Sequence, residues 1–309
     1  MNRSIETHKN LEKHENLESR ILLKLFRHSI KGEKQPDDRD VILSQEGREL
    51  AASKYIDLEN PTLAKIIGTD RIRTIETAGL IKDGDLDKTV EETLSETGIL
   101  GAPMAEVDRL DRLNFTVDAE SATGKAGYEA YGKGEWLKWV VNESDQNVLE
   151  NGDMDKNVPY SKQAANIASI IKDYFEQASD RWHKIYEAEQ DGDNQRKFPK
   201  GYGQTLERLM GSHQGVTESF LAKVIEKTKG IEERDKFVEA LNNNGFSETE
   251  GYDIEIVNDG EDKTINVNYT KFDDQGYKIF EFNESVPQEV LDEILKEGER
   301  FNVRESSKS

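Results

Sequence analysis

One short stretch decides the predicted fold: ILLKLFRHS, residues 21–29. Its first six residues form an apolar run between polar neighbours, which is typical of a buried strand. Arg27, His28 and Ser29 follow at the point where this strand ends. A polar loop then leads to Ser44, a residue that caps helices well, and the next residues predict a helix. The stretch therefore begins an alternating pattern of strands and helices.

The following segments continue the alternation. The sequence predicts a second strand over 63–70 and a second helix over 71–81. Strand, helix, strand, helix is the order of elements in a parallel α/β sheet. Residues 82–159 show little sustained apolar periodicity and predict an insertion that caps one end of the sheet. An amphipathic helix over 160–190 and a core strand over 205–213 then return the chain to the sheet.

The last segments predict a β extension. Two alternating runs, over 252–259 and 264–271, indicate a hairpin, and a third strand over 277–283 and a closing helix follow. The predicted fold is a three-layer α/β sandwich with a mostly parallel central sheet, an inserted cap and a C-terminal β-hairpin extension. Its predicted parts are a polar arm (1–19), a core (20–81 and 160–245), the cap (82–159) and the C-terminal extension (246–309).

Composition narrows the classes of function. The 309 residues carry a net charge of −21, which disfavours nucleic acid and anionic membranes as partners. The chain has no cysteine, which excludes thiolate metal sites and cysteine nucleophiles. The polar start lacks the apolar stretch of a secretory signal, and no segment is apolar over the length of a membrane span. We therefore expect a soluble, cytoplasmic protein.

Two histidines and two arginines stand in matching contexts. His28 and His213 each follow a predicted core strand, Arg27 adjoins His28, and Arg73 lies in the first turn of the helix after the second strand. Because the carboxyl ends of parallel strands lie at one edge of a sheet, all four side chains should meet there. His213 has the weaker context, since a structural role at a strand end also fits it.

These residue types suit phosphoryl transfer without a metal. The guanidinium group presents a fixed fork of donors that matches phosphate oxygens and stays charged at physiological pH. A neutral imidazole is a good nucleophile towards phosphorus near pH 7. Preorganised cations stabilise the charge on the equatorial oxygens in the transition state. The sequence thus predicts an anion site in an otherwise strongly acidic protein.

The motifs, in their order, resemble the histidine phosphatase superfamily, the phosphoglycerate mutase-like clan. The resemblance covers roughly residues 21–81 and 205–225. It rests on the strand that ends in Arg27-His28, on SQEGRELA (44–51), on TDRIRTIETA (69–78) and on SHQGV (212–216). Members of this superfamily typically carry Arg-His-Gly after the first strand and a Ser-His-Gly-Gly-like turn after the fourth strand. Ser29 stands here in place of the glycine.

What the resemblance implies is a phosphate pocket made of Arg27, His28, Arg73 and His213. His28 would attack phosphorus and become a phosphohistidine, the other three would hold the phosphoryl oxygens, and water would release phosphate. The implied activity is metal-independent hydrolysis of a phosphomonoester or phosphoramidate, on a phosphorylated small molecule or a phosphoprotein. No metal or other cofactor is implied. The cap lacks the fuller mutase pattern, so hydrolysis is favoured over a mutase reaction.

The leaving-group acid is the open part of this prediction. Many members carry the acid in a Leu-x-Glu-Leu-x-Phe-Gly-like stretch, and the nearest match here, LDRLNFT (110–116), has Arg112 at the acid's position. Asp111 is the favoured donor, with Glu106, Asp108 or no dedicated acid as alternatives. Without an acid the protein would suit good leaving groups, or would be a non-catalytic phosphate- or phosphoprotein-binding module that kept the pocket. Four aromatic residues either line the inner face of the cap or pack within it: Tyr128, Tyr131, Trp136 and Trp139.

Overall fold

The computed structural model describes residues 17–90, 92, 108–190 and 201–302. The predicted polar arm lies mostly outside them. Within the described residues, seven strands form one sheet in the order β3-β2-β4-β1-β5-β6-β7. The strands are β1 (Ser19–Arg27), β2 (Lys65–Gly68), β3 (Asp108–Arg109), β4 (Thr205–Ser212), β5 (Gly251–Asn258), β6 (Lys263–Phe272) and β7 (Lys278–Ser285).

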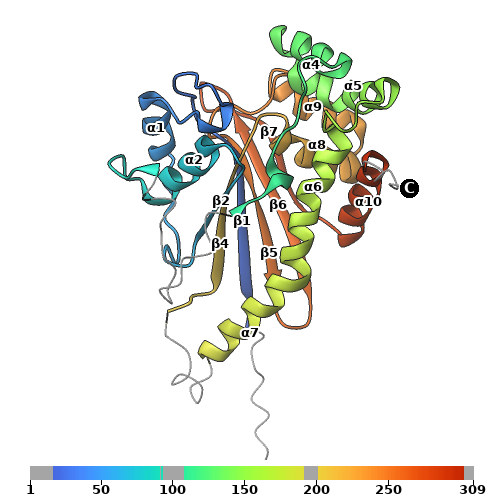
Figure 1. Ribbon diagram of the computed structural model, residues 1–309. Coiled ribbons are helices and arrows are strands. Elements are labelled where there is room, and N and C mark those ends of the chain that lie inside the picture. The colour runs from blue at the N-terminus through green and yellow to red at the C-terminus, as the bar shows by residue number, and fades with distance from the viewer. Residues whose placement is uncertain (1–16, 91, 93–107, 191–200, 303–309) are drawn as a thin grey trace, which may run out of the picture.

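Helices cover this sheet on two faces, with α1 and α2 on one side and α6, α8 and α10 on the other (Figure 1). The helices are α1 (Gln45–Ala52), α2 (Ile72–Asp83), α4 (Ala122–Gly132), α5 (Trp136–Asn151), α6 (Tyr160–Asp173), α7 (Ser179–Gln190), α8 (Val216–Lys229), α9 (Ile231–Ala240) and α10 (Gln288–Gly298). The single helix predicted over 160–190 is α6 and α7 joined by a π-helical turn, Tyr174–Ala178. None of the described helices has the length and apolarity to cross a membrane.

Alternation along β1 explains the layers. Ile21, Leu23 and Leu25 belong to the large apolar core shared with α6, α8, α9 and α10, whereas Phe26 belongs to a smaller core shared with α1 and α2. Successive side chains of a strand point to opposite faces, so one central strand serves both cores. The mixed α/β fold is therefore as the sequence predicts, with helices packed on both sides of the sheet.

The direction of the strands corrects one expectation. Of the described strand pairs, β1–β4, β2–β4 and β2–β3 are parallel, whereas β1–β5, β5–β6 and β6–β7 are antiparallel. The sheet is mixed rather than mostly parallel, and the predicted C-terminal hairpin is a continuation of the sheet. The reason is that the segment 246–250 reaches the sheet at the end of β1, where the backbone of Arg27 bonds to Thr249 and Glu250. β5 must then run back along β1 in the opposite direction.

The functional residues lie at the carboxyl edge of the parallel strands, and close packing at this edge positions them. The cap helices α4 and α5 lie above this edge (Figure 1). α2 packs closely against β4, since a Cβ at Gly211 would lie 2.2 Å from the carbonyl oxygen of Thr74. Glycine at this position lets the first turn of α2, with Arg73, approach the end of β1.

Candidate active site

His28 lies directly after β1 and is only 5% exposed. Its Nδ1 lies 2.7 Å from the carbonyl oxygen of Ser29, which can only accept, so Nδ1 carries the proton. Nε2 therefore keeps its lone pair. Burial lowers the pKa of His28 to about 3, against the Ser29 carbonyl, which raises it, and with a further lowering by the charge of Arg73. The ring is a neutral nucleophile over the physiological range.

Ser29 holds the turn after the nucleophile. Its amide donates to Thr77 Oγ1 at 3.0 Å, and its hydroxyl donates to the carbonyl oxygen of Gly47 at 2.7 Å. The backbone at Ser29 does not adopt a positive φ, so serine replaces the usual glycine without strain. The hydroxyl is used in tying the turn to α1, which leaves the turn rigid.

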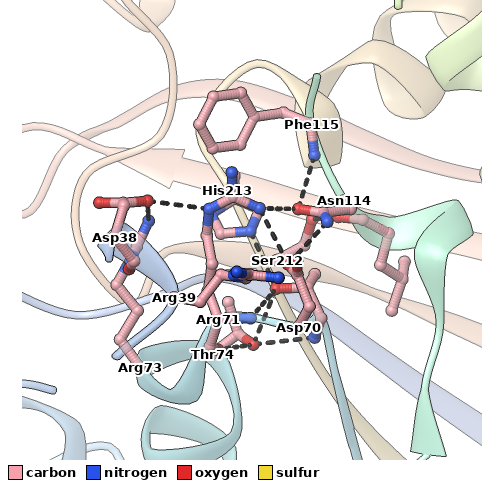
Figure 2. Close-up of polar contacts among 12 residues, drawn as sticks. Asp38, Arg39, Asp70, Arg71, Arg73, Thr74, Asn114, Phe115, Ser212 and His213 are labelled. Atoms are coloured by element: carbon pink, nitrogen blue, oxygen red, sulfur yellow. Dashed lines mark hydrogen bonds and ion pairs between the residues drawn. The ribbon is translucent and has the colours of Figure 1, made fainter. Parts of the chain in front are cut away.

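Arg73, in the first turn of α2, has no exposed surface. Its Nε lies 3.3 Å from Nε2 of His28. Its two other nitrogens reach Asp38: Nη1 donates to the backbone oxygen at 2.7 Å and Nη2 donates to Oδ2 at 2.9 Å. Figure 2 shows Asp38 beside the guanidinium end of Arg73. The predicted pairing of Arg73 with the nucleophile is therefore present in the geometry.

His213 follows β4 and faces His28, with 5.3 Å between the ring centroids. Its Nε2 lies 3.1 Å from Thr69 Oγ1, and its ring meets the ring of Phe115 edge to face at 4.9 Å. Nδ1 is buried and has no hydrogen-bond partner among the described residues. Burial, with the nearby His28 and Arg73, holds the pKa of His213 well below its usual value. The ring is thus fixed in place with one nitrogen available to a ligand.

Arg27 is anchored by the segment before β5. Its Nη1 donates to the carbonyl oxygen of Phe246 at 2.5 Å, and its Nη2 pairs with Glu248 Oε1 at 2.7 Å. Its buried Nε has no hydrogen-bond partner within the described part of the chain. Arg27 therefore keeps one donor for a ligand while two others hold the guanidinium still.

Glu218 connects the backbone segment that follows His213 with the segment that anchors Arg27. It is fully buried in the first turn of α8 and accepts from the amides of Gly215, at 2.8 Å, and Phe246, at 2.6 Å. Burial raises the pKa of Glu218 to about 7, against the amide donors and the charge of Arg27, which lower it. The turn after His213 and the carbonyl that holds Arg27 are thereby tied together.

A cavity of about 250 Å³ opens at this edge of the sheet. Cations and aromatic rings make up most of its wall, and none of the described residues that line it is a carboxylate. The lining residues are Arg27, His28, Lys31, Phe115, Val117, Tyr128, Tyr131, Trp136, His213 and Gln214. Three of the four predicted pocket residues line the cavity directly, whereas Arg73 is not among the lining residues and instead contacts Nε2 of the cavity-lining His28. Tyr128, Tyr131 and Trp136 form an aromatic wall from the cap, one of the two alternatives that the sequence left open.

The predicted acid is not at the cavity. Asp111 lies in a 3-10 turn, Asp111–Leu113, that buries Leu113 and leaves Asp111 exposed. Its neighbour Arg112 turns the other way, to Ser169 and Asp173. Of the alternatives, Asp108 is in the edge strand β3, and Glu106 lies outside the described residues. The position of Asp111 as proton donor therefore finds no support in the geometry.

Sequence reasoning missed Lys31 and Asp38, and it favoured Arg73 over Arg71 on spacing. Lys31 lines the cavity three residues after the nucleophile, and its distance along the chain from His28 was the one available signal. Arg71 lies over the ring of Phe115, 4.4 Å from its centroid, and contacts Asp70 and Asn114 (Figure 2). Asp38 comes from the loop between β1 and α1, which carries no motif.

Comparisons with known proteins give similarities of fold at low sequence identity. No family model and no curated protein matches the sequence. The chain is similar to a phosphoglycerate mutase from Bacillus anthracis str. Sterne, with a TM-score of 0.43, 14% identity, and 92% of this chain and 99% of that chain covered. It is also similar to a mycobacterial glucosyl-3-phosphoglycerate phosphatase, with a TM-score of 0.36, 14% identity, and 78% and 90% covered.

A third similarity is to a Hafnia alvei phytase, with a TM-score of 0.33, 10% identity, and 91% and 96% covered. The four ordered motifs meet at one edge of the sheet, where His28, Arg73, His213 and Arg27 lie together. In the order of its motifs, the chain resembles the histidine phosphatase superfamily, the phosphoglycerate mutase-like clan.

Proposed function

We propose that this protein is a phosphatase that hydrolyses a phosphomonoester or a phosphoramidate through a phosphohistidine on His28. One observation carries the proposal: His28 is buried, neutral and protonated on Nδ1, at the wall of a cavity that Arg27, Lys31 and His213 also line. A buried, neutral histidine next to several cations is suited to nucleophilic attack on a phosphoryl group that those cations bind.

The reaction has two displacement steps. Nε2 of His28 attacks phosphorus, the N–P bond forms, and the bond from phosphorus to the leaving group breaks. Water then attacks the phosphohistidine in line, the N–P bond breaks, and the proton of that water leaves to solvent as phosphate is released. Through both steps the Ser29 carbonyl holds the proton on Nδ1, and Arg73, Arg27 and His213 stabilise the phosphoryl oxygens.

The wall of the cavity bears on the choice of substrate. None of the described residues that line the cavity is a carboxylate, so we infer that the leaving group takes its proton from solvent or needs none. Substrates whose leaving groups are stable as anions or neutral amines, such as aryl phosphates and phosphoramidates, are therefore the class that this site favours.

A phosphoenzyme trap tests the proposal. Mixing the protein with radiolabelled aryl phosphate and quenching rapidly in alkali should retain label, which acid should then remove, as expected for a phosphohistidine. His28→Ala should show neither label nor turnover, whereas His183→Ala, on α7 beside Ser19, should keep both. Full activity of His28→Ala would overturn the mechanism. Phosphate binding without label or turnover in the wild type would favour the non-catalytic binding module.

A further inference from the structure

One carboxylate oxygen lies between two arginines next to the nucleophile. Oδ2 of Asp38 accepts from Nε of Arg71 and from Nη2 of Arg73, each at 2.9 Å. The same Arg73 extends its Nε to Nε2 of His28 at 3.3 Å. An anionic oxygen with two guanidinium donors, one step from a nucleophile, is the environment that a transferring phosphoryl group requires.

The arginines and the aspartate in this contact differ in how far their side chains are exposed. The side chain of Arg73 is completely buried, and that of Arg71 is 16% exposed, but that of Asp38 is 52% exposed. A buried guanidinium needs an anionic partner, because an uncompensated buried charge is costly. An exposed carboxylate on a three-residue turn, Asp38–Asp40, loses little when it moves into water. Another anion can therefore exchange with Asp38 while the arginines stay in place.

Arg71 is held independently of Asp38. Its Nη1 contacts Asp70 at 2.9 Å and also Asn114, and its guanidinium lies over the ring of Phe115. Phe115 lines the cavity and packs on His213. The donor Nε of Arg71 thus keeps its direction after Asp38 leaves, and it points to the same position as Nη2 of Arg73.

We propose that Arg71 is an additional phosphate-binding residue, and that Asp38 competes with the phosphoryl group for Arg71 and Arg73 by occupying the position of one of its oxygens. This inference rests on the proposed function for its ligand class, a phosphoryl dianion. Binding of a phosphoryl group moves the turn Asp38–Asp40 away from α2. Asp38 then lowers the affinity for the phosphoryl group by competition, and Arg71 raises it by direct contact. Substitutions of the two residues should therefore change this affinity in opposite directions.

Isothermal titration with inorganic phosphate measures this directly and needs no turnover. Asp38→Asn should bind phosphate about tenfold more tightly than the wild type, as expected from loss of a partly exposed pair with two guanidiniums. Asp40→Asn is the matched control, because it removes the same charge from an exposed side chain on the same turn. Its affinity should change by less than about twofold. If Asp38 merely orients Arg73, Asp38→Asn binds phosphate more weakly, and weaker or unchanged binding overturns the proposal.

Arg71→Met should weaken phosphate binding about tenfold, and Arg71→Lys should fall between Arg71→Met and the wild type. In Arg71→Met the gain from Asp38→Asn should shrink, since one of the two contested donors is gone. Circular dichroism and thermal unfolding report whether each variant is folded, and Arg71→Lys serves if Arg71→Met is not. Unchanged affinity in folded Arg71 variants refutes the role of Arg71. Failure of the proposed function appears separately, as phosphate binding that follows these signs in a protein that forms no phosphohistidine.

Discussion

Nε of Arg73 lies 3.3 Å from Nε2 of His28, so the side chain that stabilises phosphoryl charge directly adjoins the nucleophile. The contact has a consequence for protonation. Because Arg73 is a permanent cation, a proton on Nε2 of His28 would be repelled, and the lone pair stays available. The two residues come from different elements, β1 and α2, and meet at the carboxyl edge of the sheet.

Replacing Arg73 with lysine should separate the contribution of its charge from that of its guanidinium fork. Arg73→Lys keeps the charge but loses the fork that reaches both His28 and Asp38, and we expect kcat/KM to fall about 10²- to 10³-fold. Arg39→Lys is the control, since Arg39 is exposed on the neighbouring turn and pairs with Asp37. Steady-state kinetics with an aryl phosphate measure both. Equal activity of Arg73→Lys and wild type would remove Arg73 from the mechanism.

The lack of a carboxylate among the described residues that line the cavity predicts that the rate depends steeply on the leaving group. Wild type should hydrolyse nitrophenyl phosphate far faster than alkyl phosphates, since general acid catalysis contributes about 10²- to 10⁴-fold for poor leaving groups. Asp111→Asn should change neither rate, because Asp111 is exposed and away from the lining residues. A selective loss of alkyl phosphate turnover in Asp111→Asn would restore Asp111 as the donor.

The aromatic wall predicts where the leaving group binds. Tyr128 and Tyr131 are 50% and 53% exposed although they line the cavity, so removing their rings costs the fold little. Tyr128→Ala and Tyr131→Ala should each raise KM for aryl phosphates about two- to tenfold with little change in kcat. Tyr277→Ala, at a tyrosine that is 67% exposed just before β7, controls for the substitution itself. An unchanged KM would mean that the leaving group lies elsewhere.

Stability should fall on the acid side. Burial lowers the pKa of His28 to about 3 and the pKa of His213 well below its usual value, so the unfolded chain binds protons at these residues before the folded protein does. The free energy of unfolding therefore decreases as the pH falls below about 6.5, by up to about 1.4 kcal/mol per pH unit for each histidine. Above that pH neither histidine contributes a slope.

Urea unfolding of wild type and His28→Gln at pH 7.5 and 5.5 measures this contribution. His28→Gln should lose less stability between the two pH values than wild type does, because one buried base has been removed. The same loss in both proteins would show that His28 takes up its proton at the same pH in the folded and unfolded states.

Activity should survive chelation. The cavity wall carries Arg27 and Lys31, which repel a divalent cation, and charge stabilisation by arginine replaces the role that a metal plays in other phosphoryl transfers. Turnover of an aryl phosphate in excess EDTA should therefore equal turnover without it. A loss that Mg²⁺ or Zn²⁺ restores would contradict the proposal.

Much of the fold could be predicted because its signals are local. The apolar run of β1, the cap at Ser44 and the alternation along β5 and β6 are each contained in a few residues, and each element formed within a few residues of its predicted range. The direction of β5, by contrast, is not determined by a local sequence signal. It depends on where the segment 246–250 meets Arg27, which is a contact across more than two hundred residues.

The residues of the site also divide into those with a local sequence signal and those without one. His28, Arg73 and His213 follow strand ends or begin a helix, so topology alone brings them together. Asp38 and Lys31 lie between β1 and α1, where the sequence follows neither a strand nor a helix period, and the capped turn Asp38–Asp40 is too short to show one. The assignment of Asp111 as the acid stays a prediction without geometric support, since a spacing argument that fits Asp111 to a motif does not say how a 3-10 turn orients the side chain.

The positions of the two strands that pair with β1 determine when β1 can fold during synthesis. Residues 19–27 pair with 205–212 on one side and with 251–258 on the other, so β1 has both neighbours only after the chain has been synthesised past residue 258. Until then Ile21, Leu23 and Leu25 form an unpaired apolar edge, which is a hazard for aggregation. Folding should therefore be slow, as is typical of contacts between distant parts of a chain. Nascent chains that stop before β5 would carry every motif of the site and still depend on chaperones for their solubility.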